Sequence, residues 1–276
     1  YFYEQKSKFR QPDEDYERAA GSYLPRRIPV VIRVDGKAFH TFTKGMKKPF
    51  DGVFAAAMQK TMKDMCENAQ GCILSYTQSD EISLVLTDYA TIHTDAWFEY
   101  NVQKMASIAA SMATLYFNRN FMEEAIEKTF SDGAVYSIYR SKFNQAMFDA
   151  RVFSVPQDDV CNYLVWRQQD ATRNSIESMG QVYLGHKTIQ GKKTDQVQDM
   201  LFTKCGINWN DMPVNLKRGS CCIREESTFW TPDPQNKDKI IDVTRRKWVI
   251  DNDIPIFTQD RDYIDIQVVA FPQYGI

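Results

Sequence analysis

Two acidic segments of this chain have the residue types needed for phosphoryl-transfer chemistry. Asp35-Gly36 follows the apolar run at residues 28–34, and Asp80-Glu81 lies in a polar stretch between two further apolar runs. Carboxylates at neighbouring strand ends can hold two divalent cations, one activating an attacking hydroxyl and the other neutralising a departing pyrophosphate. Asp35 and Asp80 are therefore candidates to bridge two ions, and nucleotide chemistry is the first hypothesis.

Each segment alone is a weak signal, because an Asp-Gly pair is usually only a turn. The Asp35 carboxylate and the Gly36 carbonyl are hard oxygen donors that suit Mg²⁺. Glu81, beside Asp80, has three open interpretations: a ligand, a catalytic helper or a surface residue. The presence of both segments, rather than either one, favours a metal site.

The flanking elements must bring the two segments together. Residues 28–34 are β-branched and almost continuously apolar, which predicts a strand covered on both faces. Residues 51–69 have helical periodicity, with Asp51 as N-cap, and residues 72–86 predict a hairpin with a polar tip. This order is typical of a split βαβ unit, in which the third strand lies between the first two. Asp35 and Asp80 should therefore meet at one end of the sheet.

The rest of the chain is less regular. We expect a second helix over about residues 95–117, strands at 135–139 and 149–155, and a third helix from Pro156 to about Met179. Short strands are expected at 220–224 and 239–243. We therefore divide the chain into an N-terminal arm (1–27), a catalytic domain (28–200) and a smaller, irregular, β-rich C-terminal extension (201–276).

Composition limits the classes of function. The 276 residues carry 34 Lys and Arg against 36 Asp and Glu, so any nucleic-acid surface must come from local segregation of charge. The six cysteines show no CxxC pair and no zinc-site spacing, which favours reduced thiols in a reducing compartment. No apolar run is long enough to span a membrane. We expect a cytoplasmic protein, or a mitochondrial one if a leader has been removed.

Several motifs resemble the tRNA-histidine guanylyltransferase family. Residues 33–40 (RVDGKAFH) resemble its first metal motif, and residues 76–81 (YTQSDE) its second. The resemblance continues through Lys48-Pro49, Trp97-Phe98, Lys104, and residues 148–151 and 163–170. It covers about residues 28–222.

The resemblance implies an α+β fold with a polymerase- and cyclase-like palm, a ferredoxin-like antiparallel sheet with helices on one face. It implies two Mg²⁺ ions held by Asp35, the Gly36 carbonyl and Asp80, with Glu81 as a further catalytic candidate. It also implies activation of an RNA 5′-monophosphate by ATP or GTP, followed by 3′-to-5′ addition of a nucleotide. The nucleotide-binding residues it implies are Asp35, Gly36, Lys37, Ala38, Phe39, His40, Lys48, Ser79, Asp80, Lys104 and Asn174, of which Lys48 and Lys104 would contact phosphates of the activating nucleotide.

One segment departs from the family pattern. Members that add the extra guanosine to histidine tRNA carry His-Ile-Asn-Asn-Leu-Tyr-Asn where residues 172–178 here read Thr-Arg-Asn-Ser-Ile-Glu-Ser. This form resembles the guanylyltransferase-like branch, whose members are similar to template-dependent enzymes that repair or edit 5′-truncated tRNAs. The resemblance therefore implies tRNA and nucleoside triphosphates as partners, and a homo-oligomer built as a dimer of dimers.

Other residues have more than one interpretation. Phe39 is a candidate to stack a base, whereas Trp97, Phe98, Tyr163 and Trp166 have the apolar spacing of core residues. Two alternatives to the transferase remain, a nucleotidyl cyclase on the same palm and a non-catalytic tRNA-binding protein. Candidate RNA contacts, each with solvated surface as the competing interpretation, are Arg173, Lys192, Lys193, Lys217 and Arg218.

Overall fold

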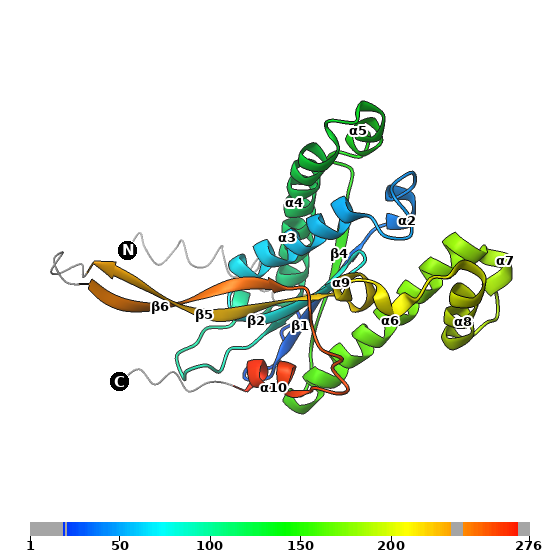
Figure 1. The fold of residues 1–276 in the computed structure, drawn as a ribbon. Helices are drawn as coiled ribbons and strands as arrows, with labels where there is room; N and C mark the ends of the chain where they lie inside the picture. The colour runs from blue at the N-terminus through cyan, green and yellow to red at the C-terminus, as the bar shows by residue number, and fades with distance from the viewer. Residues whose placement is uncertain (1–18, 20, 233–239, 270–276) are drawn as a thin grey trace, which may run out of the picture.

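The structure is a computed structural model that describes residues 19, 21–232 and 240–269. Its centre is a six-stranded antiparallel sheet with strand order β4-β1-β3-β2-β5-β6 (Figure 1). This confirms the predicted α+β class and the position of β3 between β1 and β2. The strands are β1 (Val30–Gly36), β2 (Cys72–Gln78), β3 (Glu81–Leu86), β4 (Phe148–Ser154), β5 (Ser220–Pro232) and β6 (Ile240–Asp251).

Helices α3 (Gly52–Asn68) and α4 (Val102–Thr129) cover the first face of the sheet. The side chains of Val30, Ile32 and Val34 point into this layer and are fully buried. Asp51 caps α3 as predicted, because its carboxylate accepts a hydrogen bond from the backbone N–H of Phe54 at 2.8 Å.

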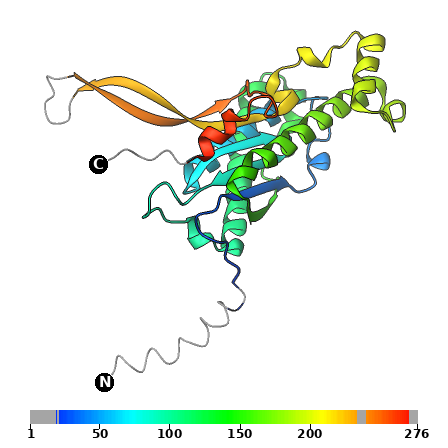
Figure 2. The ribbon, with the colours of Figure 1, turned by 90° about the horizontal axis from the view of Figure 1, so that it is seen from below.

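Helices α6 (Val160–Leu184) and α10 (Asp262–Val268) cover the opposite face, and Figure 2 shows α6 crossing it. Val31, Leu74 and Val85 are fully buried against this layer. The expectation of helices on one face only was therefore wrong. The strands are apolar on both sides, so a second helical layer is needed to exclude water from the other side.

Two other predicted elements were wrong in type or extent. Residues 135–139 lie in helix α5 (Gly133–Arg140), because Asp132 caps its backbone N–H groups and overrides the β-branched composition. The second long helix is α4, which starts at Val102 where Asn101 caps it, after a short 3₁₀ helix η1 (Trp97–Tyr100). It also extends further than expected, to Thr129.

The remaining helices form a lobe beyond the end of the sheet. This helical lobe contains the C-terminal half of α6, with α7 (His186–Ile189) and α8 (Thr194–Cys205), packed around a third apolar cluster that includes Met179, Leu201 and Trp209, while α9 (Val214–Arg218) lies against α6 and β2. Three short helices complete the described residues: α2 (Phe39–Phe42), η2 (Gln157–Asp159) and η3 (Trp209–Asp211).

The C-terminal strands continue the main sheet and then leave it. β5 pairs with β2 only over residues 220–222, and beyond that point β5 and β6 run as a two-stranded ribbon away from the body (Figure 1). Both strands are much longer than predicted. The domain boundaries near residues 27 and 200 stay predictions, and most of the N-terminal arm lies outside the described residues. No helix among the described residues has the length and apolar character needed to cross a membrane.

Candidate active site

The two acidic segments meet at one end of the sheet. Asp35 is paired with Glu81 in the β1–β3 register, and the Gly36 N–H donates to the Asp80 carbonyl at 3.1 Å. The predicted convergence of the two segments is therefore confirmed. It arises because β1 and β3 are antiparallel neighbours, so the end of one lies beside the start of the other.

Unusual backbone conformations hold both turns in place. Ser79 has φ 54° and Ala38 has φ 56°, a region that L-residues other than glycine rarely adopt. At Gly36, an added Cβ would lie 2.3 Å from the Phe39 ring, so only glycine lets that ring pack beneath the turn. The local sequence thus holds the two half-buried carboxylates at the turns, above a tightly packed chain.

Asp80 is desolvated and close to a second negative charge. Burial raises the pKa of Asp80, and the negative charge of Asp35 raises it further. Hydrogen bonds from its own backbone and from Ser79 Oγ at 3.0 Å lower the pKa but do not outweigh these effects. Two crowded carboxylates and an adjacent backbone carbonyl form a set of hard oxygen donors. These residues fit a divalent cation such as Mg²⁺, whose charge would relieve the repulsion between them.

Glu81 lies in a different environment from Asp80. It forms ion pairs with Arg33 at 2.5 Å and with Arg167 of α6 at 3.2 Å, while Arg33 also reaches Asp35 at 3.3 Å. Burial raises the pKa of Glu81, although both arginines oppose this shift. Glu81 thus belongs to an ion-pair network that links β1, β3 and α6.

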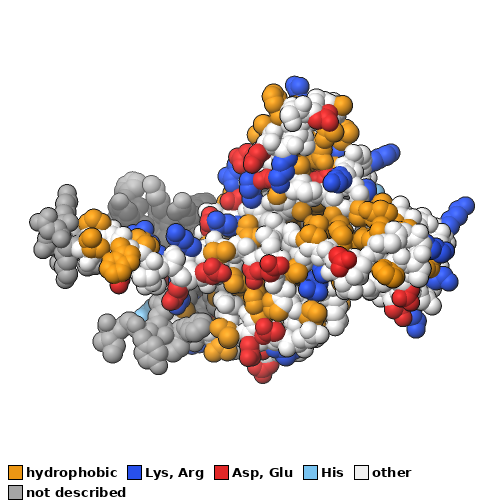
Figure 3. Space-filling view, in the orientation of Figure 1, with side chains coloured by type: hydrophobic (Ala, Val, Ile, Leu, Met, Phe, Trp, Pro, Cys, Tyr) orange, Lys and Arg blue, Asp and Glu red, His pale blue; other side chains and the backbone are white. Residues whose placement is uncertain are grey.

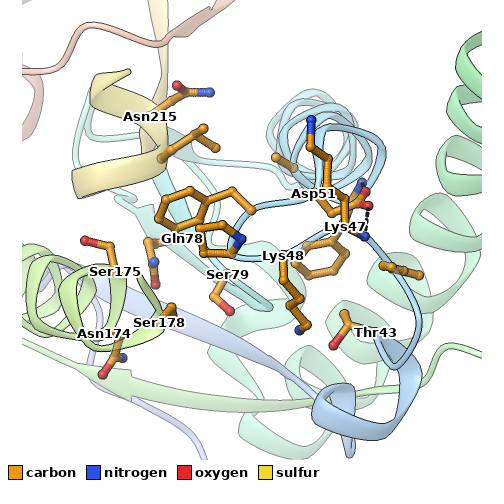
Figure 4. A pocket seen from close by; sticks show the side chains of 16 residues that line it. Thr43, Lys47, Lys48, Asp51, Gln78, Ser79, Asn174, Ser175, Ser178 and Asn215 are labelled. Carbon is orange, nitrogen blue, oxygen red and sulfur yellow. Dashed lines mark hydrogen bonds between the residues drawn. The ribbon is translucent and has the colours of Figure 1, made fainter. Parts of the chain in front are cut away.

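Two adjoining cavities lie beside the acidic turns. The larger, of about 190 Å³, is lined by Lys48, Ser79 and Asn174, which the sequence placed at the nucleotide (Figure 4). In Figure 4 the Lys48 side chain extends into the space between Ser79 and Thr43. The smaller, of about 70 Å³, shares Ser79 and Asn174 and reaches Asp80. The structure therefore brings these predicted residues together around two adjoining cavities.

Lys104 is the predicted nucleotide contact that the fold does not bring to this place. It lies in the first turn of α4, where the neighbouring Val102 N–H bonds to Ser22 and the Tyr100 carbonyl accepts from Leu24. That segment precedes β1, so Lys104 is at the end of the sheet opposite the acidic turns. Its ammonium group lies 4.9 Å from the centre of the Phe98 ring.

Phe39 cannot stack on a base in this structure, so that expectation was wrong. Its ring is 4 % exposed and packs against a cluster of aromatic rings that includes Phe42, Phe117 and Phe148. Lys37 and His40, which flank it, are exposed. The alternation of buried and exposed side chains here comes from the short helix α2 that follows the turn.

The candidate RNA contacts divide into exposed and buried groups. Lys192 and Lys193 are exposed between α7 and α8, and Arg173 is exposed on α6, where it pairs with Asp170. Lys217 was wrongly assigned: it is 7 % exposed, donates to the Asn210 carbonyl at 2.6 Å and lies over the Trp209 ring. Burial lowers the pKa of Lys217.

Arg218 and Trp166 also differ from expectation in their surroundings. Arg218 is half-buried, and its carbonyl accepts a hydrogen bond from Tyr76 at 2.6 Å, so its backbone has a structural role. Trp166 was expected in the core but is 55 % exposed, on the outer side of α6. The guanidinium group of its neighbour Arg167 lies 4.5 Å from the ring centre.

Arg33 and Arg167 are parts of the site that reasoning from the sequence missed. Arg33 is two residues before Asp35, so strand alternation places both on one face, and this signal was readable from the sequence. Arg167 had no such signal, because its contact with Glu81 spans two elements far apart in the chain. Thr43 and Gln78, which also line the larger cavity, were missed for the same reason.

Comparison with known proteins shows consistent similarity to one family. The family model described as tRNAHis guanylyltransferase matches residues 13–156. The tRNA(His) guanylyltransferase of Schizosaccharomyces pombe is 28% identical over 275 residues, covering 94% of this chain and 95% of that protein. A probable tRNA(His) guanylyltransferase of Dictyostelium discoideum is 26% identical over 236 residues, covering 81% of this chain and 82% of that protein.

Solved structures give the same result. A bacterial tRNA(His) guanylyltransferase-like protein in complex with ATP has 40% identity and a TM-score of 0.76, covering 95% of this chain and 99% of that chain. The complex with GTP has 37% identity and a TM-score of 0.73 over the same shares. The Saccharomyces cerevisiae tRNA(His) guanylyltransferase, with 21% identity and a TM-score of 0.59, covers 87% of this chain and 95% of that chain and shares the fold.

Proposed function

Because this chain belongs to the tRNA(His) guanylyltransferase family, we propose that it is a nucleotidyltransferase that extends the 5′ end of tRNA in the 3′-to-5′ direction. The observation that carries the proposal is the meeting of Asp35 and Asp80 beside a cavity lined by Lys48, Ser79 and Asn174. Similarity to the guanylyltransferase-like protein at 40% identity favours the branch inferred from residues 172–178.

Asp35, the Gly36 carbonyl and Asp80 are the proposed ligands of two Mg²⁺ ions. When bound, the ions would activate the attacking hydroxyl and offset the charge of the leaving pyrophosphate. The chain's own contribution is to hold both carboxylates at one sheet end, where burial and mutual repulsion favour cation binding. Glu81 supports these residues through its ion pairs with Arg33 and Arg167.

The polar side of the larger cavity is the proposed triphosphate site. Lys48 supplies a positive charge, Ser79 a hydroxyl and Asn174 an amide, all suited to phosphate oxygens. Lys37 and His40 are exposed beside the Asp35 turn and complete the proposed nucleotide contacts, with Ala38 and Phe39 contributing through their backbone. Complexes of the bacterial relative with ATP and GTP support nucleotide binding of this kind.

The proposed reaction has two transfers. In the first, a 5′-monophosphate oxygen of the RNA attacks the α-phosphorus of ATP, which releases pyrophosphate and leaves an activated 5′ end. In the second, the 3′-hydroxyl of the incoming nucleotide attacks that 5′-phosphorus, forms the new phosphodiester and releases AMP. Selection of the incoming nucleotide by pairing with the opposite strand of the acceptor stem is part of the proposal.

The helical lobe is the proposed contact for the RNA duplex. Between Glu177 and Asp195 the chain has no acidic residue but carries Lys187, Lys192 and Lys193, all exposed. Figure 3 shows Lys and Arg side chains at the outer end of this lobe.

Three further points remain proposals. They are a homo-oligomer, the role of Lys104 at the activating nucleotide, and a cytoplasmic or mitochondrial location.

A direct assay tests the function. The protein is incubated with a 5′-truncated, 5′-phosphorylated tRNA, ATP, Mg²⁺ and labelled nucleoside triphosphates, with Asp80→Ala as control, and the tRNA 5′ ends are sequenced. We expect nucleotides complementary to the opposite strand to join the 5′ end only with the unaltered protein. No addition, or equal addition by the control, would refute the proposal.

The names of the relatives do not favour the two alternative functions, a nucleotidyl cyclase and a non-catalytic tRNA-binding protein. A nucleotidyl cyclase would release a cyclic nucleotide from ATP or GTP without RNA. A non-catalytic tRNA-binding protein would bind tRNA equally well with EDTA present, and nucleoside triphosphates would not raise its thermal stability.

A further inference from the structure

A row of alternating charges lies directly beneath the acidic turns. It runs from Asp35 to Arg33 (3.3 Å), to Glu81 (2.5 Å), to Arg167 (3.2 Å) and to Asp170 (2.8 Å). It links β1, the start of β3 and helix α6, three elements that are distant in sequence. Asp170 also pairs with Arg173 and lies 3.4 Å from the Asn174 amide, and it lines the smaller cavity.

Arg167 is the most buried member of this row. Its side chain is 6 % exposed, against 26 % for Glu81 and 21 % for Asp170. Its Nη2 atom donates a hydrogen bond to Asp170 at 2.8 Å and lies 3.2 Å from a Glu81 oxygen, so one buried positive charge holds carboxylates of two different elements together. Removal of one partner would leave the other charge uncompensated, which is costly in a desolvated place.

Asp80 and Glu81 therefore have different tasks although they are adjacent. Both Glu81 oxygens contact arginines, whereas the Asp80 carboxylate accepts a hydrogen bond from the hydroxyl of its neighbour Ser79. Glu81 is the first residue of β3, so anchoring its carboxylate anchors the end of the turn that carries Asp80. This division leaves the Asp80 oxygens available to a cation.

We propose that Arg167 is a positioning residue: it holds Glu81 against helix α6, and so keeps Asp80 and Asn174 at the spacing that a metal-bound nucleotide needs. The proposal rests on the proposed function, since it concerns the same site. It assigns Glu81 to support rather than to metal ligation, and it gives α6 a direct part in organising the site.

Cation binding, measured apart from turnover, tests the proposal. Mn²⁺ is titrated into the protein with GTP present, and free Mn²⁺ is followed by electron paramagnetic resonance for the unaltered chain, Arg167→Lys, Glu81→Gln and the double variant. We expect each single variant to bind Mn²⁺ about 10–100-fold more weakly, as for other residues that orient metal ligands. Because Arg167 acts through Glu81, the double variant should be no weaker than Glu81→Gln alone.

Arg119→Lys is the matched control, since Arg119 also pairs with a carboxylate, Asp64 at 2.7 Å, but on the α3–α4 layer. It should bind Mn²⁺ as the unaltered chain does. Unchanged affinity in Arg167→Lys and Glu81→Gln, or additive losses in the double variant, would overturn the positioning role. Absence of Mn²⁺ binding by the unaltered chain would instead refute the proposed metal site. Thermal unfolding identifies any variant that is not folded. If Arg167→Lys is not folded, Glu81→Gln, which preserves side-chain shape, is the variant that decides between the outcomes.

Discussion

At the scale of single residues, the adjacent carboxylates Asp80 and Glu81 have different properties because their surroundings differ. Glu81 is held between two arginines, while Asp80 is desolvated next to Asp35 with little compensation inside the chain. A carboxylate without a positive partner inside the chain lowers the stability of the fold, but it raises the affinity of the site for a cation. The same residue pair, Asp-Glu, thus supplies one proposed ligand and one proposed support.

Asp80→Asn should separate function from stability. We expect turnover to fall by orders of magnitude, because a metal ligand is lost without loss of core volume. The pKa of Asp80 is raised above its ordinary value of 3.8, so ionisation of this group costs stability once the pH exceeds that value. In metal-free buffer the variant should therefore be at least as stable as the unaltered chain at pH 7, and this advantage should vanish below about pH 3.8. Thermal unfolding over a pH series measures it, and clear destabilisation at pH 7 would show that the carboxylate is structural.

Lys48→Ala should act mainly on the activation step. Lys48 lies in the cavity that we propose binds the triphosphate, and its loss removes positive charge without disturbing the core. Addition to a 5′-monophosphorylated tRNA should fall, and a 5′-triphosphorylated tRNA, which needs no activation, should restore it. Single-turnover rates on the two substrates measure the effect, and equal losses on both would assign Lys48 another role.

At the scale of elements, a buried carboxylate joins the two helices that support β1. Glu124 of α4 is 4 % exposed and pairs with Lys60 of α3 at 2.5 Å and with Lys128 at 2.6 Å. Burial alone would raise the pKa of Glu124, but hydrogen bonds from Lys128 and Lys60 outweigh it and lower the pKa below its ordinary 4.5. Its contribution to stability is therefore present above that pH and is lost as the pH falls through the lowered value.

Glu124→Gln should destabilise the α3–α4 layer. We expect the free energy of unfolding at pH 7 to fall by about 1.5–3 kcal/mol, the range for hydrogen bonds to charged groups. The deficit should shrink as the pH drops below 4.5 and disappear below the lowered pKa, where the unaltered side chain is neutral in the folded chain as well. Denaturant unfolding at several pH values measures it. Glu123→Gln, at a more exposed neighbouring position, is the control, and an equal effect there would argue against the buried pair.

At the scale of the whole molecule the net charge is only -2, but the stretch between Glu177 and Asp195 carries lysines and no acidic residue. The exposed lysines of the helical lobe lie beyond Asn174, past the end of the same helix that borders the active-site cavities. In the proposed complex, an RNA duplex with its 5′ end at Asp35 and Asp80 would contact this lobe. Attraction to RNA therefore depends on local geometry rather than on overall charge.

A double variant, Lys192→Ala with Lys193→Ala, should weaken tRNA binding to a similar degree for tRNAs of different sequence. Removing a lysine that binds a phosphate should reduce the slope of log affinity against log salt by about 0.7–0.9. Equilibrium binding of a labelled tRNA across a salt series measures both effects. Lys63→Ala, at a half-buried lysine of α3 that pairs with Glu67, should leave the slope unchanged. An unchanged slope in the double variant would remove the lobe from the RNA surface.

Short-range patterns determined much of this protein from sequence alone. The apolar run before Asp35, the Asp51 cap and the polar hairpin tip specify elements through contacts within a few residues, so their type and order were readable. Their order then implied the sheet arrangement that joins Asp35 and Asp80. The element at 135–139 was misread because one cap, Asp132, outweighed β-propensity.

Only the tertiary structure decided which side chains are buried and which share a site. Phe39 and Lys217 are buried in the structure, and Trp166 is exposed. Lys104 lies at the far end of the sheet, and Arg167 contacts Glu81. These outcomes depend on packing between elements that are distant in sequence, and one chain carries no local signal for such contacts. Burial and ion pairing are properties of the assembled layers, so the second helical face and the support it gives to the site appeared only once the chain was folded.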